Sequence, residues 1–111
     1  MKIHSIEEFK GGWFIGDFEP NLLHTQMFEA AVKYYRAGDV DKKHYHKVAT
    51  EITVVVSGTV RMNGKIYDEG TVIVMEPGEA TDFEALTDVR NVVIKVPSVK
   101  GDKYEEGGVP C

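Results

Sequence analysis

The sequence is almost free of cysteine. Its 111 residues contain one, Cys111, at the last position. An internal disulfide framework is therefore excluded, and Cys111 lacks the neighbouring bases or cations that activate a nucleophilic thiol. The absence of disulfides is typical of a protein in a reducing compartment, so we predict a cytoplasmic location.

Long apolar runs and basic runs are also absent. The longest apolar stretches are of the size of Val72 to Met75, whereas a bilayer-spanning helix needs about 20 residues. The first residues contain no apolar segment typical of a signal peptide. Lys and Arg (13) are mixed among Asp and Glu (18), with a net charge of −5. A nucleic-acid-binding protein usually carries a basic face. We therefore expect neither nucleic acid nor a membrane as partner.

The composition is that of one small globular domain. Hydrophobic residues make up 42% and charged residues 28% of the chain, which is enough apolar surface for one core and excludes global disorder. We predict a single domain over residues 1–100. Residues 101–111 are polar and glycine-rich, and we expect them to form a flexible C-terminal tail.

Short β-branched and aromatic segments separated by turn residues dominate the chain. Periodicity leaves residues 28–36 open between helix and strand, but Tyr34-Tyr35 favours a strand. Asn63-Gly64 predicts a two-residue hairpin. The predicted strands cover residues 28–36, 43–47, 52–56, 59–62, 65–67, 71–75, 80–84 and 91–96. Regular spacing of this kind predicts an all-β barrel or jelly roll. Ser5 and Glu8 form a capping-box pattern, so one short N-terminal helix is an alternative to a frayed terminus.

The most concentrated chemical signal is His44-Tyr45-His46, followed by Glu51. In a strand, residues i and i+2 share a face, so the two imidazoles should point the same way. Glu51 lies an odd number of residues after His46, so on one straight strand its side chain would point to the opposite face. A turn at residues 47–50 would instead place Glu51 at the start of the neighbouring strand, where its side chain could face both histidines. Two imidazoles and one carboxylate suit Fe, Mn, Zn, Ni or Co as a divalent ion. The competing interpretation is a solvated surface strand without metal.

This segment resembles the first motif of the cupin superfamily. The matching positions, with the family's spacing, are Gly38, His44, His46, Glu51 and Gly58. The resemblance covers about residues 28–96 and implies a cupin-type double-stranded β-helix. It also implies that the two histidines and Glu51 are metal ligands, and that the protein is a homodimer.

The second cupin motif is only partial. Gly70 and Gly78 are in place, but Thr81 stands where the family has its fourth ligand, a histidine, and Ala85 stands where it has an asparagine. Three possibilities follow. The metal could be held by three protein ligands, Asp82 could replace the histidine if a bulge turned it inward, or the site could bind metal weakly and serve as a polar pocket.

Strand alternation also predicts a pocket lining. If Glu51 points inward, so do Thr53 and Val55, and if Thr81 points inward, so does Phe83. Tyr35, on the preceding strand, is added with less certain parity. For Val55 and Phe83 the favoured competing interpretation is that they are plain core residues. Two basic strand residues, Arg61 and Lys95, could meet an anionic substrate, but lone basic residues on strands are usually solvated.

Three functions are compatible with these features. The first is a metal-dependent isomerase or epimerase acting on a sugar or similar small metabolite. The second is an Fe(II)-dependent dioxygenase, and the third is a non-catalytic protein that binds or senses a small molecule. A barrel with an inactive relic motif is the least specific possibility. The sequence leaves open whether the protein is an enzyme, and it does not name the substrate.

Overall fold

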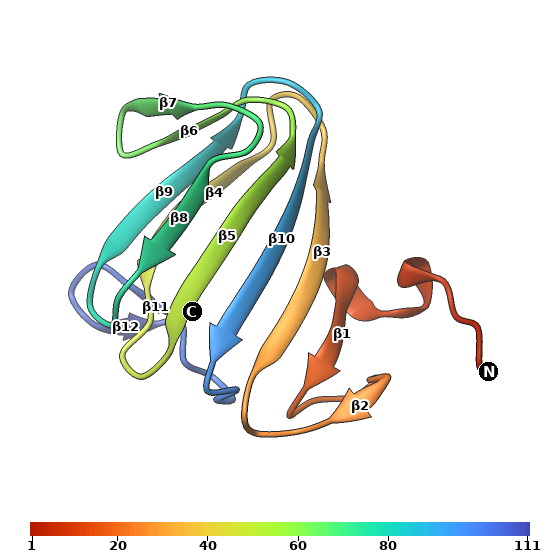
Figure 1. Cartoon of the computed structure of the whole chain (residues 1–111). Helices are drawn as coiled ribbons and strands as arrows, with labels where there is room; N and C mark the ends of the chain where they lie inside the picture. The colour runs from red at the N-terminus through yellow and green to blue at the C-terminus, as the bar shows by residue number, and fades with distance from the viewer.

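Two β-sheets of six strands each form the computed structural model, which describes residues 1–111 (Figure 1). The first sheet has the order β2 (Leu23–His24), β1 (Trp13–Gly16), β3 (Glu29–Tyr35), β10 (Val89–Val96), β5 (Thr50–Ser57) and β8 (Val72–Met75). The second has the order β12 (Val109–Pro110), β11 (Tyr104–Glu105), β4 (Val40–Tyr45), β9 (Ala80–Ala85), β6 (Val60–Met62) and β7 (Lys65–Tyr67). The all-β prediction is confirmed.

The ambiguous segment 28–36 forms a strand, as its aromatic pair indicated. It becomes β3, which pairs with β1 on one side and along its whole length with β10 on the other. The predicted hairpin is also confirmed: Asn63 and Gly64 have φ angles of 49° and 79° and connect β6 to β7. Both φ values are positive, as the tight turn requires.

The N-terminus begins with two short 3-10 helices, η1 (Ile6–Glu8) and η2 (Lys10–Gly12). The capping box is present, because the Ser5 hydroxyl accepts from Glu7 while the Glu8 carboxylate accepts from the Ser5 amide. These turns are the only helical elements. None of them is long and apolar enough to cross a bilayer.

The apolar core occupies one end of the space between the sheets, near the β6–β7 hairpin (Figure 1). It consists of Val55, Val60, Met62, Phe83, Ala85 and Val89. Strand alternation explains its composition, because Val55, Ala85 and Val89 are inward positions of β5, β9 and β10 at this end. Buried Asn91 lies opposite Val55, and further toward the other end the inward positions include the polar cross-strand row Glu29, Lys95 and Glu51.

A bulge in β4 changes which of its residues face inward. Asp41 pairs with Phe83 and His44 pairs with Thr81, so three steps on β4 match two steps on β9. Such an extra residue inverts the alternation of a strand. Asp41 and His44 therefore face the same interior, although they are an odd number of residues apart.

Residues 101–111, predicted as a C-terminal tail, contain β11 and β12, which form one edge of the second sheet. Tyr104 pairs with Tyr45 and Glu105 pairs with His44, and β12 folds back on β11. The stacked rings of Tyr45 and Tyr104, with centroids 5.8 Å apart, add an apolar contact that composition alone does not reveal.

Candidate metal centre and barrel cavity

A cavity of about 210 Å³ lies at the polar end of the barrel. Its walls come from both sheets, with β3, β5 and β10 on one side and β4 and β9 on the other. His44 and Glu51 line it directly. His46 follows β4 and is 4% exposed, and its imidazole centroid lies 5.7 Å from that of His44.

Both histidines are oriented by main-chain carbonyl groups. Nδ1 of His44 lies 2.9 Å from the oxygen of Lys42, and Nδ1 of His46 contacts the oxygen of Asp102. A carbonyl oxygen can only accept, so in each ring Nδ1 must donate and carry the proton. In the neutral imidazoles Nε2 then carries the lone pair. Metal-binding histidines are commonly held in this way.

Nε2 of His46 is buried and has no hydrogen-bond partner. Its nearest charged neighbour is Oε2 of Glu51, at 3.6 Å, which is beyond hydrogen-bonding distance. A buried polar atom without a partner costs free energy, and such atoms often mark a place where an ion or ligand binds.

The protonation states also suit a cation. Burial lowers the pKa of His44, the Lys42 carbonyl opposes this, and the nearby Lys103 lowers the pKa further, so His44 is neutral at pH 7. Burial raises the pKa of Glu51, but neighbouring groups, among them the ammonium of Lys95, outweigh burial and bring this pKa below its usual value. Metal binding requires this combination of neutral imidazole and ionised carboxylate.

His44, His46 and Glu51 are neighbours, but they do not form a preassembled metal-ligating cluster. The two features that fit a metal are the unpartnered Nε2 of His46 and the fixed tautomers of both rings. The donor set, two imidazoles and one carboxylate, is one that divalent transition ions accept. The chemistry of these residues therefore fits such an ion.

The two candidates for a fourth ligand are placed differently. Thr81 is buried, lines the cavity and pairs with His44 across the strands. Its hydroxyl donates to the Asp82 carbonyl at 2.7 Å. Asp82 is exposed on the other face of β9, where its carboxylate accepts from the Asn63 amide at 2.7 Å. No bulge in β9 turns it inward.

The predicted pocket residues lie in the interior, but not all line the cavity. Tyr35, Thr53 and Phe83 are in its wall, with the Tyr35 and Phe83 rings 4.6 Å apart. Val55 is fully buried in the apolar core and does not line the cavity. Arg61 is turned away and pairs with Glu84 at 2.9 Å.

Several cavity residues escaped sequence reasoning. Lys33, Asn91 and Lys103 line the cavity, and so does Asp41, which the β4 bulge turns inward. Lys95, a lone basic strand residue of the kind that is usually solvated, also lies in the wall. The pairing of β3 with β10, which places Lys33 opposite Asn91, is not visible in local periodicity.

Asp102 is the other important residue that the sequence did not reveal. It is 7% exposed, and its carboxylate accepts from the amides of Lys47 (2.8 Å), Val48 (3.2 Å) and Ala49 (2.9 Å). Its main-chain oxygen contacts His46. Asp102 thus holds both a candidate ligand and the loop that leads from that ligand to Glu51.

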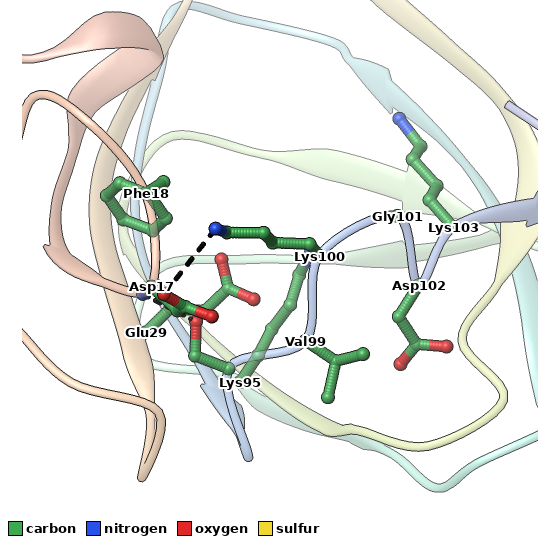
Figure 2. A pocket seen from close by; sticks show the side chains of 10 residues that line it. Asp17, Phe18, Glu29, Lys95, Val99, Lys100, Gly101, Asp102 and Lys103 are labelled. Carbon is green, nitrogen blue, oxygen red and sulfur yellow. Dashed lines mark hydrogen bonds and ion pairs between the residues drawn. The ribbon is translucent and has the colours of Figure 1, made fainter.

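A second hollow of about 320 Å³ adjoins the cavity (Figure 2). The two share Lys95 and Lys103 in their walls. Figure 2 shows Asp102 and Lys103 pointing in different directions from one segment, and Lys100 reaching toward Asp17. The ammonium of Lys100 lies 3.7 Å from a carboxylate oxygen of Asp17. In the segment 101–103, the Asp102 carboxylate therefore binds the amides of the loop 47–49 that follows His46, while the next side chain, Lys103, lines the cavity.

Comparison with known proteins identifies the fold. No family model and no curated protein matches the chain. Among solved structures, an uncharacterised protein with a double-stranded β-helix domain from Klebsiella pneumoniae is 18% identical, with a TM-score of 0.65 over 87% of this chain and 85% of that one. An RmlC-like cupin from Shewanella frigidimarina is 18% identical, with a TM-score of 0.63 over 68% and 71%.

The DMSP lyase DddQ from Ruegeria pomeroyi is also 18% identical, with a TM-score of 0.70 over 86% of this chain and 50% of that one. This chain therefore spans half the length of that enzyme. Identities at this level establish architecture and not activity. The chain has the double-stranded β-helix fold of the cupin superfamily.

Proposed function

We propose that this protein binds one divalent transition metal ion through His44, His46 and Glu51 and acts on a small molecule in the barrel cavity. The observation that carries the proposal is the buried Nε2 of His46, which has no partner and lies beside the Glu51 carboxylate. When bound, such an ion would act as a Lewis acid on a substrate oxygen.

The cavity favours an isomerase or epimerase over a purely binding protein. Beyond the candidate ligands it holds Tyr35, Asp41 and Lys33, which are groups able to donate or accept protons. Burial, followed by the carboxylates of Asp41 and Glu51, raises the pKa of the Tyr35 phenol. Tyr35 therefore stays protonated at neutral pH, and its hydroxyl can donate a hydrogen bond to an oxygen of the bound ligand. Isomerases and epimerases need proton transfer beside a polarised carbonyl.

The experiment compares metal content and turnover in matched histidine variants. His46→Ala removes a candidate ligand, whereas His24→Ala removes an exposed histidine hydrogen-bonded to Asp17. We expect His46→Ala to lower metal affinity about 100-fold or more, because a ligand is worth at least as much as the groups that orient it. His24→Ala should retain the metal. Turnover that persists in metal-free protein would contradict the proposal.

A non-catalytic binding protein is the second candidate, because Thr81 occupies the place of a fourth ligand. Thr81→His puts an imidazole directly opposite His44. If the metal site is real, this variant should bind metal more tightly than the wild type. A protein that binds a metabolite and leaves it unchanged under all metal conditions would favour this second function.

We also propose that a second copy of the chain covers the outer face of the first sheet. Two cross-strand rows on this face are wholly aliphatic: Val32, Val92, Val54 and Val72, and Ala30, Ile94, Ile52 and Val74. Val72 and Val74 are at least half exposed. These rows carry no charge that would select a different partner, and a flat apolar face is complementary to itself across a two-fold axis.

A further inference from the structure

The cavity that holds the candidate metal ligands also gathers three lysines, Lys33, Lys95 and Lys103, and the buried amide of Asn91. We propose that these residues recognise a small hydroxy acid, with the lysines binding its carboxylate and Asn91 accepting a hydrogen bond from its hydroxyl. This inference rests on the proposed function and names the substrate class for the same site.

The charge of the cavity runs against that of the chain. The protein carries a net charge of −5, yet three ammonium groups and only two carboxylates, Asp41 and Glu51, line this cavity. Glu51 is assigned to the metal, so among the lining residues only Asp41 opposes the three lysines, while Glu29, opposite Lys95 on β3, is not part of the lining. A cavity of one sign within a protein of the other sign attracts ligands of opposite charge.

None of the three lysines forms an ion pair. The ion pairs of the structure join other residues, including Lys43 with Glu106 and Lys100 with Asp17. Lys33 is half-buried on β3, and its ammonium lies 5.8 Å from the ring centroid of Trp13; that of Lys95 lies 4.9 Å from the same centroid. The indole face thus contacts both cations, while their nearest carboxylates, Asp41 for Lys33 and the cross-strand neighbours Glu29 and Glu51 for Lys95, form no ion pair with them. The ammonium groups therefore remain available to an anionic ligand.

The electrostatics of Lys33 supports this arrangement. Burial lowers the pKa of Lys33, Asp41 opposes this, and the positive charges of Lys103 and Lys95 lower the pKa further. The three ammonium groups therefore repel one another at close range. A bound carboxylate would relieve that repulsion and form charge-assisted hydrogen bonds, which are stronger than neutral ones.

Asn91 supplies the second, independent observation. It is 2% exposed, and its Oδ1 has no hydrogen-bond partner. It lies on β10 directly opposite Lys33 on β3. A buried amide oxygen of this kind rejects a ligand that offers it no donor, because the oxygen would stay unpaired. A hydroxyl group next to the carboxylate meets this need.

The size of the cavity restricts the ligand further. At about 210 Å³ it is smaller than the roughly 300–1,000 Å³ typical of drug-sized ligands. No arginine and no glycine lines it. Arginine forks and glycine-rich loops are frequent features of phosphate sites. A small organic acid fits these features better than a phosphorylated one.

Calorimetric titration of the purified protein, both metal-free and loaded with Zn²⁺, tests the inference. The probes are malate and glycerate, with malamide and glyceramide as uncharged counterparts, succinate as a counterpart of malate without the hydroxyl, and inorganic phosphate. We expect each acid to bind at least about tenfold more tightly than its amide, and malate about tenfold more tightly than succinate. Phosphate should bind more weakly than malate.

Matched variants assign the effect to residues. Lys33→Gln and Lys103→Gln should each weaken malate binding about tenfold, whereas Lys65→Gln, an exposed lysine on β7, should leave it unchanged. Asn91→Leu should remove the preference for malate over succinate while succinate still binds. Because Asn91 is buried, circular dichroism must first show that this variant is folded.

The outcomes separate this inference from the proposed function. If the protein binds Zn²⁺ but binds neither acid better than its amide, the hydroxy-acid inference is wrong and the metal site stands. If the acids bind as expected in a protein that retains no metal, the inference stands and the metal site fails. Equal losses in Lys33→Gln and Lys65→Gln, or tighter binding of phosphate than of malate, would also overturn it.

Discussion

Replacing Asp102 by alanine should loosen the fold and the metal site together. Its carboxylate accepts three main-chain N–H groups from residues 47–49. Of these, Ala49 is 1% exposed, so its amide would be left buried without a partner at a cost of about 1–3 kcal/mol. The amides of Lys47 and Val48 belong to exposed residues and can turn to water, at about 0.5–1.5 kcal/mol each.

These losses add to about 2–6 kcal/mol in the free energy of unfolding. For a domain of this size they correspond to a fall in Tm of about 10–25 °C. Metal affinity should fall about 10- to 100-fold, because the Asp102 carbonyl that orients His46 would no longer be fixed. Thermal denaturation followed by circular dichroism measures the first effect, and calorimetric titration with Zn²⁺ well below the Tm measures the second.

Asp82→Ala is the matched control. Asp82 is exposed and accepts one N–H group, from Asn63, on the outer face of β9. This variant should lose no more than about 1 kcal/mol and keep the metal affinity of the wild type. An Asp102→Ala protein that unfolds at the wild-type temperature, or that binds Zn²⁺ as tightly as Asp82→Ala, would refute the reasoning.

Three further predictions concern the outer sheet face, a glycine and an ion pair. Val54→Lys places a charge in the middle of the aliphatic rows and should convert a dimer to a monomer in analytical ultracentrifugation. The control Ile66→Lys, on exposed β7, should leave the dimer intact. A wild-type protein that is already a monomer would contradict the proposed dimer. Gly58→Ala should lower the free energy of unfolding by at least about 2–3 kcal/mol in denaturant unfolding, because φ is +93° and a Cβ would lie 2.2 Å from the Asp88 main-chain oxygen. Gly78→Ala is the control: φ is +87° but the space is open, so it should lose about 1 kcal/mol. Equal losses in the two variants would argue against the clash at Gly58. The pKa of Asp17 lies below its usual value of 3.8, chiefly because its carboxylate is hydrogen-bonded to His24. In His24→Ala this pKa should rise, as followed by NMR titration of Asp17. An unchanged Asp17 pKa would contradict the contact.

Local pattern predicted the parts of the fold that depend on neighbouring residues. The Asn63-Gly64 turn and the run that became β5 follow from turn chemistry and β-branched composition. Alternation along β5 also predicted that Thr53 faces inward with Glu51, and the turn that returns Glu51 toward the histidines lies where it was expected.

The residues that sequence reasoning missed depend on contacts between distant segments. Asp41 faces the cavity only because of the β4 bulge, and a bulge has no reliable signal in one sequence. Asp102 reaches the His46 loop across more than 50 residues. Its glycine-rich surroundings suggested a flexible tail, since composition does not show that a carboxylate will find three free amides.

Val55 lies at a different depth from Thr53, although strand alternation places both on the inward face of β5. One step further along β5 the interior has changed from cavity to core, and Val55 packs with Val60 and Phe83. Parity gives the side of a strand that faces inward. It does not give the depth at which a cavity ends.

The central claim concerns the two imidazoles, and a long-range ¹H–¹⁵N NMR spectrum tests it most directly. Before metal is added, His44 and His46 should both carry their proton on Nδ1, as their carbonyl partners require. One equivalent of Zn²⁺ should then shift both Nε2 resonances and leave those of His4 and His24 in place. Protonation of Nε2 in either ring, or Nε2 signals that do not respond to the metal, would contradict the account.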